Sequence, residues 1–142
     1  MLNSRSRLSD LTPHQIGALG EKIAAKYLQS LGWKLLYRNF RAPKGGEVDL
    51  VMRGGNGLKL LVFVEVKTRT RRDFGRPMRA VNAEKKNLIM RGGLEWLRLL
   101  GKEVDAETKP DVRRQISWRY DVVEIILTEG EVPDINLVEQ AF

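Results

Sequence analysis

The chain has 142 residues, no cysteine, a single histidine and a net charge of +7, which predicts one basic domain large enough to bury a core. The lack of cysteine excludes disulfides, thiolate zinc sites and cysteine nucleophiles, and the lone His14 excludes a histidine-based metal site or a serine–histidine relay. Any catalysis must therefore use carboxylates, lysine, tyrosine or a bound metal.

The N-terminal residues 1–11 are expected to form a loose basic arm, followed by a single domain over residues 12–142. The start of the chain is polar and has no apolar core of the kind found in signal peptides. The longest apolar run, residues 60–64, is too short to cross a bilayer. We therefore expect a cytoplasmic protein with no membrane partner.

A first helix is expected to begin with Thr12 as its N-cap and Pro13 in its first turn. Apolar residues then recur at helical spacing, and Gly32 is placed to end the helix. Gly20 lies on or beside the apolar face. Its missing side chain would let another element approach closely.

Three strands are expected next, over residues 33–38, 47–52 and 58–68, separated by two glycine-containing turns. The middle of the third strand is apolar on both faces, which predicts a central position in the sheet. Alternation should place Val48 and Leu50 together on one face of the second strand.

The remaining elements are an arginine-rich loop over residues 68–79 and a second helix, capped by Asn82 and stopped by Gly101 after Leu100. Gly92 and Gly93 each cost this helix about 1 kcal/mol relative to alanine, which a kink or a close helix–sheet contact would explain.

A fourth strand over residues 116–127 and a short fifth over 135–138 complete the order αβββαβ(β). This order predicts an α/β fold in which helices flank a mixed central sheet. Three aromatic residues of the first and fourth strands are expected in the core, namely Trp33, Trp118 and Tyr120.

Three charged side chains on the second and third strands form the candidate active site. Alternation puts Asp49 on one strand near Glu65 and Lys67 on the next, if the strands pair through their turn. Two carboxylates can bind Mg²⁺ or Mn²⁺, with the Val66 carbonyl as a further oxygen ligand, and a lysine can position water and stabilise charge on phosphorus. A plain salt bridge between Lys67 and either carboxylate is the structural alternative.

Two further glutamates lie close to this set in the expected fold. Glu21, beside Gly20 on the first helix, could orient a metal-bound water or bind a second metal, or it could be an ordinary surface residue. Glu47 lies one pleat from Asp49 on the same strand and is expected to contact the metal-binding residues rather than the metal itself. Crowding of these carboxylates should raise the pKa of at least one of them.

Basic residues flank the candidate site. Residues 67–91 contain nine basic and two acidic side chains, a distribution that indicates a polyanionic partner more than a merely solvated surface. A supporting ion pair between Arg119 and Asp121 is also expected on the fourth strand. The side chains expected to contact phosphates are Arg38, Arg41, Arg69, Arg71, Arg72 and Lys85.

Several spaced motifs resemble the YraN family of small bacterial proteins. They include Gly20-Glu21, Arg38-Asn39-Phe40-Arg41, Gly46-Glu47-Val48-Asp49, Phe63-Val64-Glu65-Val66-Lys67 and Arg119-Tyr120-Asp121, and the resemblance covers nearly the whole chain. It implies a restriction-endonuclease-like core similar to Holliday-junction resolvases and other PD-(D/E)xK nucleases. Asp49, Glu65 and Lys67 match that motif, although Val48 stands where the motif has proline. Glu21 matches the helix glutamate of the resolvases.

These observations together favour an Mg²⁺- or Mn²⁺-dependent endonuclease that hydrolyses phosphodiester bonds of nucleic acid, with DNA, including branched DNA, expected rather than RNA. The alternatives are a non-catalytic nucleic-acid-binding or repair-accessory domain, and a protein–protein adaptor whose basic loop meets an acidic partner. A homodimer is expected, because enzymes that cut both strands of a duplex commonly pair two sites by two-fold symmetry.

Overall fold

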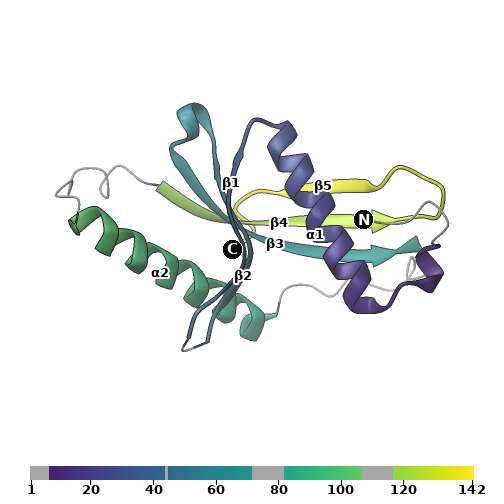
Figure 1. Ribbon diagram of the computed structural model, residues 1–142, viewed down its shortest axis with the longest axis horizontal. Helices are drawn as coiled ribbons and strands as arrows, with labels where there is room; N and C mark the ends of the chain where they lie inside the picture. Colours follow the sequence, from purple (N-terminus) through teal and green to yellow (C-terminus); the bar gives the residue numbers. More distant parts are fainter. Residues whose placement is uncertain (1–6, 44, 72–81, 107–116) are drawn as a thin grey trace.

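The computed structural model describes residues 7–43, 45–71, 82–106 and 117–142 (Figure 1). Over these described residues, the fold has two long helices and five strands, together with two short 3₁₀ helices that precede the first long helix and the third strand. In chain order these elements are η1 (Leu8–Asp10), α1 (Pro13–Ser30), β1 (Lys34–Arg41), β2 (Glu47–Gly54), η2 (Asn56–Leu58), β3 (Leu60–Thr70), α2 (Ala83–Ala106), β4 (Ser117–Leu127) and β5 (Asp134–Val138).

The strands form one mixed sheet in the spatial order β1-β2-β3-β4-β5. The β3–β4 pair is parallel, and the other three pairs are antiparallel. A parallel pair needs a long crossover, and α2 lies in the segment that makes it. The expected mixed sheet of an α/β fold and the central position of β3 are confirmed.

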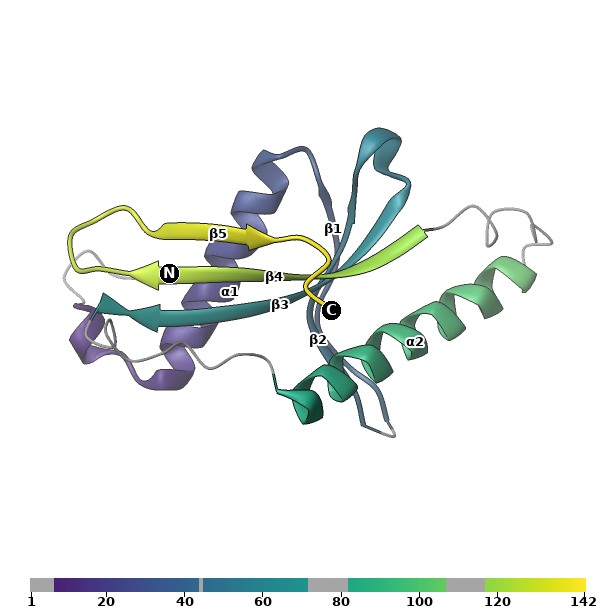
Figure 2. The same ribbon diagram turned by 180° about the vertical axis from the view of Figure 1, so that it is seen from behind.

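The two helices pack on opposite faces of the sheet. Ala24, Ala25 and Leu28 of α1 pack against one set of strand residues, including Val62 and Val64. Ile89 of α2 belongs to a second cluster with Phe63. Figure 1 shows α1 crossing in front of β3–β5, and Figure 2 shows it behind them. Alternate residues of β3 therefore serve two separate cores, which explains why its middle is apolar throughout.

The start of α1 is capped as its sequence predicts. Pro13 is its first residue, and Thr12 Oγ1 accepts a hydrogen bond of 3.2 Å from the Gln15 N–H. The Gln15 side chain in turn accepts from the Thr12 N–H at 2.9 Å, completing a capping box. Before it, η1 lies in the part of the expected loose arm that the structure describes, and Leu8 N–H donates to Glu129 Oε2 at 2.7 Å.

Gly20 lets α1 approach β3 closely, as expected. A Cβ atom built on Gly20 would lie 1.8 Å from Thr68 Oγ1 and 2.7 Å from Thr68 Cβ. Since even the Thr68 Cβ is too close, a change of rotamer cannot relieve the overlap. The backbone of α1 at Gly20 therefore packs directly against the Thr68 side chain of β3. This contact brings Glu21, the next residue of α1, beside the end of β3.

This contact predicts opposite outcomes for two glycines of the same helix. Gly20→Ala should lower the free energy of unfolding by about 3 kcal/mol through overpacking. Gly17→Ala should raise it by about 1 kcal/mol, because nothing lies within 4 Å of its added Cβ and alanine favours the helix. Urea unfolding of both variants measures the difference. Equal effects would mean that α1 does not rest on Thr68.

The glycine pair of α2 marks a close helix–sheet contact, one of the two explanations considered. A Cβ on Gly92 would lie 2.9 Å from backbone atoms of Glu47, and one on Gly93 would lie 2.7 Å from Tyr120 Oη. Gly46 faces the same contact, since its Cβ would lie 2.7 Å from the Gly92 nitrogen. The close approach of Gly92 to Gly46 therefore holds α2 against the beginning of β2.

Two expectations for this half of the chain are wrong. Gly101 does not end α2, which continues to Ala106, because one interior glycine costs only about 1 kcal/mol and no proline follows it in the helix. Trp118 is not a core residue, since it is 49% exposed. It lies at the start of β4, where the strand is exposed, two residues before the buried Tyr120.

The ion pair expected on β4 is confirmed. Arg119 Nε lies 2.9 Å from Asp121 Oδ1, and the Asp121 carboxylate is fully buried. The same oxygen accepts the Gln140 N–H at 3.0 Å, so the pair also anchors the chain after β5.

None of the helices in the described part of the chain is long and apolar enough to cross a bilayer.

Candidate active site

The candidate site lies where β2 separates from β3. Their ladder ends at the pair Leu50 and Val64, and Figure 1 shows β1 and β2 turning steeply across β3–β5. This twist also makes the expected face of β2 wrong, because Val48 packs in the cluster of α2 whereas Leu50 packs under α1. We call the place where the two strands separate, next to Leu50 and Val64, the fork. There the backbone groups of β3 no longer pair with the backbone of β2 and are available to its side chains.

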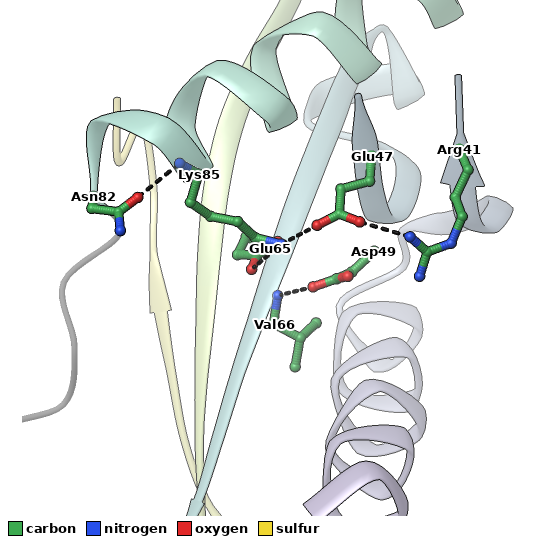
Figure 3. A network of polar contacts seen from close by, with 7 residues as sticks. All are labelled: Arg41, Glu47, Asp49, Glu65, Val66, Asn82 and Lys85. Atoms are coloured by element: carbon green, nitrogen blue, oxygen red, sulfur yellow. Dashed lines mark hydrogen bonds and ion pairs between the residues drawn. The ribbon is translucent and has the colours of Figure 1, made fainter. Parts of the chain in front are cut away.

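Asp49 closes the fork with its side chain. Asp49 Oδ2 accepts a hydrogen bond of 2.8 Å from the Val66 N–H (Figure 3). The Asp49 carboxylate thus accepts the N–H of Val66 just past the last paired residues, Leu50 and Val64, where a continuing ladder would supply a main-chain carbonyl. This bond fixes Asp49 against β3 and beside Glu65.

Glu65 is the most deeply buried carboxylate of the site, with 6% of its surface exposed. Burial, and then the negative charge of Asp49, raise its pKa to about 8. Its Oε2 atom is buried and receives no hydrogen bond from any described residue. An acidic oxygen in this position is stabilised either by a proton or by a cation.

Glu47 behaves differently from the other carboxylates. Arg41 Nη1 lies 2.7 Å from Glu47 Oε2, and Lys85 Nζ bonds the other oxygen. The hydrogen bond from Lys85 lowers the pKa of Glu47. The expected rise in the pKa of at least one carboxylate is found at Glu65, but burial contributes most of it and the charge of Asp49 comes second, whereas Glu47 is held as a charged group.

Lys85 lies inside this cluster, a placement the sequence did not predict. It stands in the first turn of α2, where its N–H donates to the Asn82 side chain at 2.8 Å, so the expected cap is confirmed. Its Nζ contacts Glu47 and lies 3.6 Å from Glu65 Oε1 (Figure 3). In this structure the ammonium therefore pairs with carboxylates of the protein.

Glu21 approaches the same place from α1. Burial, followed by the charge of Asp49, raises the pKa of Glu21, while a hydrogen bond with the Asn39 side chain opposes that rise. Asn39 has a left-handed backbone, with a φ of 51°. Sequence reasoning did not single out Asn39 as a site residue. Asparagine before an apolar strand position could have suggested it, because asparagine tolerates this conformation.

A pocket adjoins this side of the site. Its volume is about 340 Å³, and its lining includes Glu21, Val66, Thr68 and Arg69. Lys67 follows on β3, half-buried and in register with Glu124 of β4. The pocket and Lys67 both lie next to the residue whose N–H binds Asp49.

The expected phosphate-binding arginines occupy different surroundings. Arg41 is exposed and paired with Glu47, Arg38 is exposed on β1, and Arg69 lies half-buried on β3. Arg71 is exposed directly after that strand, and Arg72, with most of the expected 68–79 loop, lies outside the described residues. The first residues of that loop, 68–70, extend β3.

The donor set fits a hard divalent cation with few protein ligands. No group of three or more histidine, cysteine or acidic side chains with metal-binding geometry occurs in the described ranges. Asp49 and Glu65 nevertheless offer two adjacent carboxylates, one of them with an oxygen lacking a donor. Mg²⁺ commonly binds through one or two carboxylates and keeps several waters.

Comparison with known proteins places these residues in a family. Residues 20–125 match the model of "Uncharacterised protein family UPF0102", a range that includes every acidic residue of the site. Relatives named UPF0102 protein include one from Trichlorobacter lovleyi, 36% identical over 127 residues and 89% of each chain. Another, from Rhodococcus jostii, is 39% identical over 89% of this chain and 95% of its own. A third, from Caldicellulosiruptor saccharolyticus, is 35% identical over 93% of this chain and all of its own length.

Proposed function

The chain belongs to the uncharacterised protein family UPF0102, also called YraN, and we propose that it is an Mg²⁺- or Mn²⁺-dependent endonuclease that hydrolyses DNA phosphodiester bonds. The observation that carries this proposal is the contact of Asp49 with Glu65 at the fork of β2 and β3. There a buried carboxylate oxygen has no donor among the described residues.

The fold supports the same proposal. A mixed sheet with one helix on each face, and carboxylates on two adjacent strands next to its centre, is consistent with a restriction-endonuclease-like core. We assign the fold to that class, with Asp49, Glu65 and Lys67 as its PD-(D/E)xK set. Because folds host many functions, the chemistry of these side chains carries the functional argument.

Asp49 and Glu65 would hold the cation, with the Val66 carbonyl as a further oxygen. When bound, the cation supplies Lewis-acid activation of the phosphoryl group and of a water nucleophile. The Val66 N–H keeps Asp49 in place throughout, because its hydrogen bond comes from the main chain of a central strand. Two ligands fixed by adjacent strands require little reorganisation when the cation arrives.

Lys67 and Glu21 would act directly on the reacting groups. The Lys67 ammonium would position the attacking water and donate to the phosphoryl oxygens as negative charge develops on them. Glu21 would orient that water or accept its proton, which suits a carboxylate whose pKa is raised. The two residues belong to different elements, Lys67 to β3 and Glu21 to α1.

The experiment for this proposal is a cleavage screen of linear, flapped and four-way-branched DNA, and of matching RNA, with Mg²⁺ and with Mn²⁺. We expect metal-dependent cleavage of DNA, with branched forms included among the substrates. Binding of these nucleic acids without cleavage under any metal would instead support the non-catalytic accessory domain.

Binding by the arginine-rich segment has its own test. Changing Arg71 and Arg72 together to alanine should reduce the slope of log affinity against log salt by about two units, since each lost phosphate contact removes nearly one. Arg98→Ala is a suitable control, because Arg98 pairs with Glu95 on α2. An unchanged slope in the double variant would show that this segment does not follow the phosphate backbone.

Assembly gives a further prediction. One chain offers one site, so cutting both strands of a duplex would require two copies related by two-fold symmetry. We expect light scattering to give the mass of a homodimer in the presence of branched DNA. A monomer with and without that DNA would contradict this expectation and would leave single-strand cleavage as the activity to test.

A further inference from the structure

We propose that Lys85 is a built-in counter-ion of the site, whose ammonium neutralises Glu47 and occupies the place beside Glu65 until a divalent cation displaces it. The proposal rests on the proposed metal site and adds a positioning role for a residue of α2. It predicts that the chain's own cation and the metal compete for Glu65.

The first support is that Lys85 is held in place by the fold. Asn82 caps the turn that carries it, and the close contact of Gly92 with the backbone of Glu47 fixes α2 against β2. The helix therefore presents Lys85 at a set distance from the carboxylates. A lysine on a freely solvated face would have no such constraint.

The second support is the arrangement of charge. Lys85 Nζ bonds Glu47 and lies 3.6 Å from Glu65 Oε1, while Arg41 contacts the other oxygen of Glu47. Asp49 adds a third carboxylate beside Glu65. Without the metal, the ammonium thus offsets the negative charge that Glu47 places beside Glu65 and Asp49 in a partly buried position, where charges interact strongly.

The third support is that the ammonium and a metal cannot both stay next to Glu65 at low cost. Two cations sharing one carboxylate would repel each other at a few ångströms in a poorly solvated site. The Lys85 side chain is 32% exposed, and its flexible stem allows it to turn outward. It can move into solvent, or approach a phosphate, when Glu65 binds the metal.

Titration of Mn²⁺ into the metal-free protein tests the competition directly. Lys85→Met keeps the apolar stem and removes the charge, and it should bind Mn²⁺ about tenfold more tightly than the wild type, the change expected when one close cation is removed. Lys86→Met is the matched control, since Lys86 is the next residue of α2 and lies over the Phe142 ring. It should bind as the wild type does.

Thermal melts separate this role from a merely structural one. Lys85→Met should melt below the wild type without metal, and saturating Mn²⁺ should bring the two melting temperatures together. Equal lowering with and without Mn²⁺, or an Mn²⁺ affinity no tighter than that of Lys86→Met, would overturn the proposal while leaving the nuclease proposal intact.

A measurement on the wild type covers the case in which the Lys85 variant fails to fold. Mn²⁺ should increase acetylation of Lys85 by an amine-reactive reagent several-fold, measured by peptide mass spectrometry, and should leave Lys86 unchanged. Unchanged or reduced labelling of Lys85 by a protein that binds Mn²⁺ would overturn the proposal. If the wild type binds no Mn²⁺ at all, the metal site itself is wrong, and the counter-ion role falls with it.

Discussion

Asp49→Asn is expected to reduce metal-dependent cleavage of DNA on the order of 10³-fold or more, since it removes a metal-binding carboxylate from the transition state. Asparagine retains a side-chain oxygen that can accept the Val66 N–H, so the fork between β2 and β3 should remain closed. Affinity for DNA should be unchanged or higher, because a negative charge facing the phosphates is lost. Single-turnover cleavage and binding of the same DNA measure the two effects.

Asp134→Asn provides the matched control for this experiment. Asp134 is exposed at the start of β5, and its substitution makes the same change in charge and size. Its cleavage rate should equal that of the wild type. Full cleavage by Asp49→Asn, or equal loss in both variants, would remove Asp49 from the active site.

The pH dependence of stability should change strongly in Glu65→Gln. The pKa of Glu65 in the folded protein is raised to about 8, from an ordinary value of 4.5. The protonated carboxyl therefore stabilises the metal-free fold fully below the ordinary pKa, and this contribution is lost as the pH rises through about 8. As the pH rises between those values, the free energy of unfolding should fall by on the order of 1 kcal/mol for each pH unit on account of this one proton.

Glutamine cannot ionise, so the variant should lack this component of the decline. Urea unfolding from pH 5 to pH 8.5 without divalent cations measures it, with Glu131→Gln as a control at an exposed position between β4 and β5. The control should keep the wild-type trend. Parallel curves for Glu65→Gln and the wild type would show that Glu65 is ionised in the metal-free fold.

Local rules predicted the parts of the site that depend on neighbouring strands. Alternation and a glycine-rich turn were enough to place Asp49 beside Glu65. The apolar middle of β3 was enough to place that strand at the centre of the sheet. Gly20 could be interpreted correctly because a glycine on a packed helix face has few other uses.

The rest depends on contacts between residues far apart in the sequence. Lys85 enters the cluster because Gly92 of α2 meets the start of β2, and no periodicity within the helix encodes that meeting. Val48 packs against α2 because β2 twists after leaving β3. Trp118 is 49% exposed although Tyr120, two residues further along the same strand, is buried, a difference that aromatic character alone cannot reveal.

Calorimetric titration of Mn²⁺ tests most directly whether Asp49 and Glu65 together form a metal site. The wild type is compared with the double variant Asp49→Asn/Glu65→Gln, both folded as judged by circular dichroism. The account predicts saturable binding by the wild type that is absent from the double variant. Equal binding by both proteins, or no binding by the wild type, would contradict it.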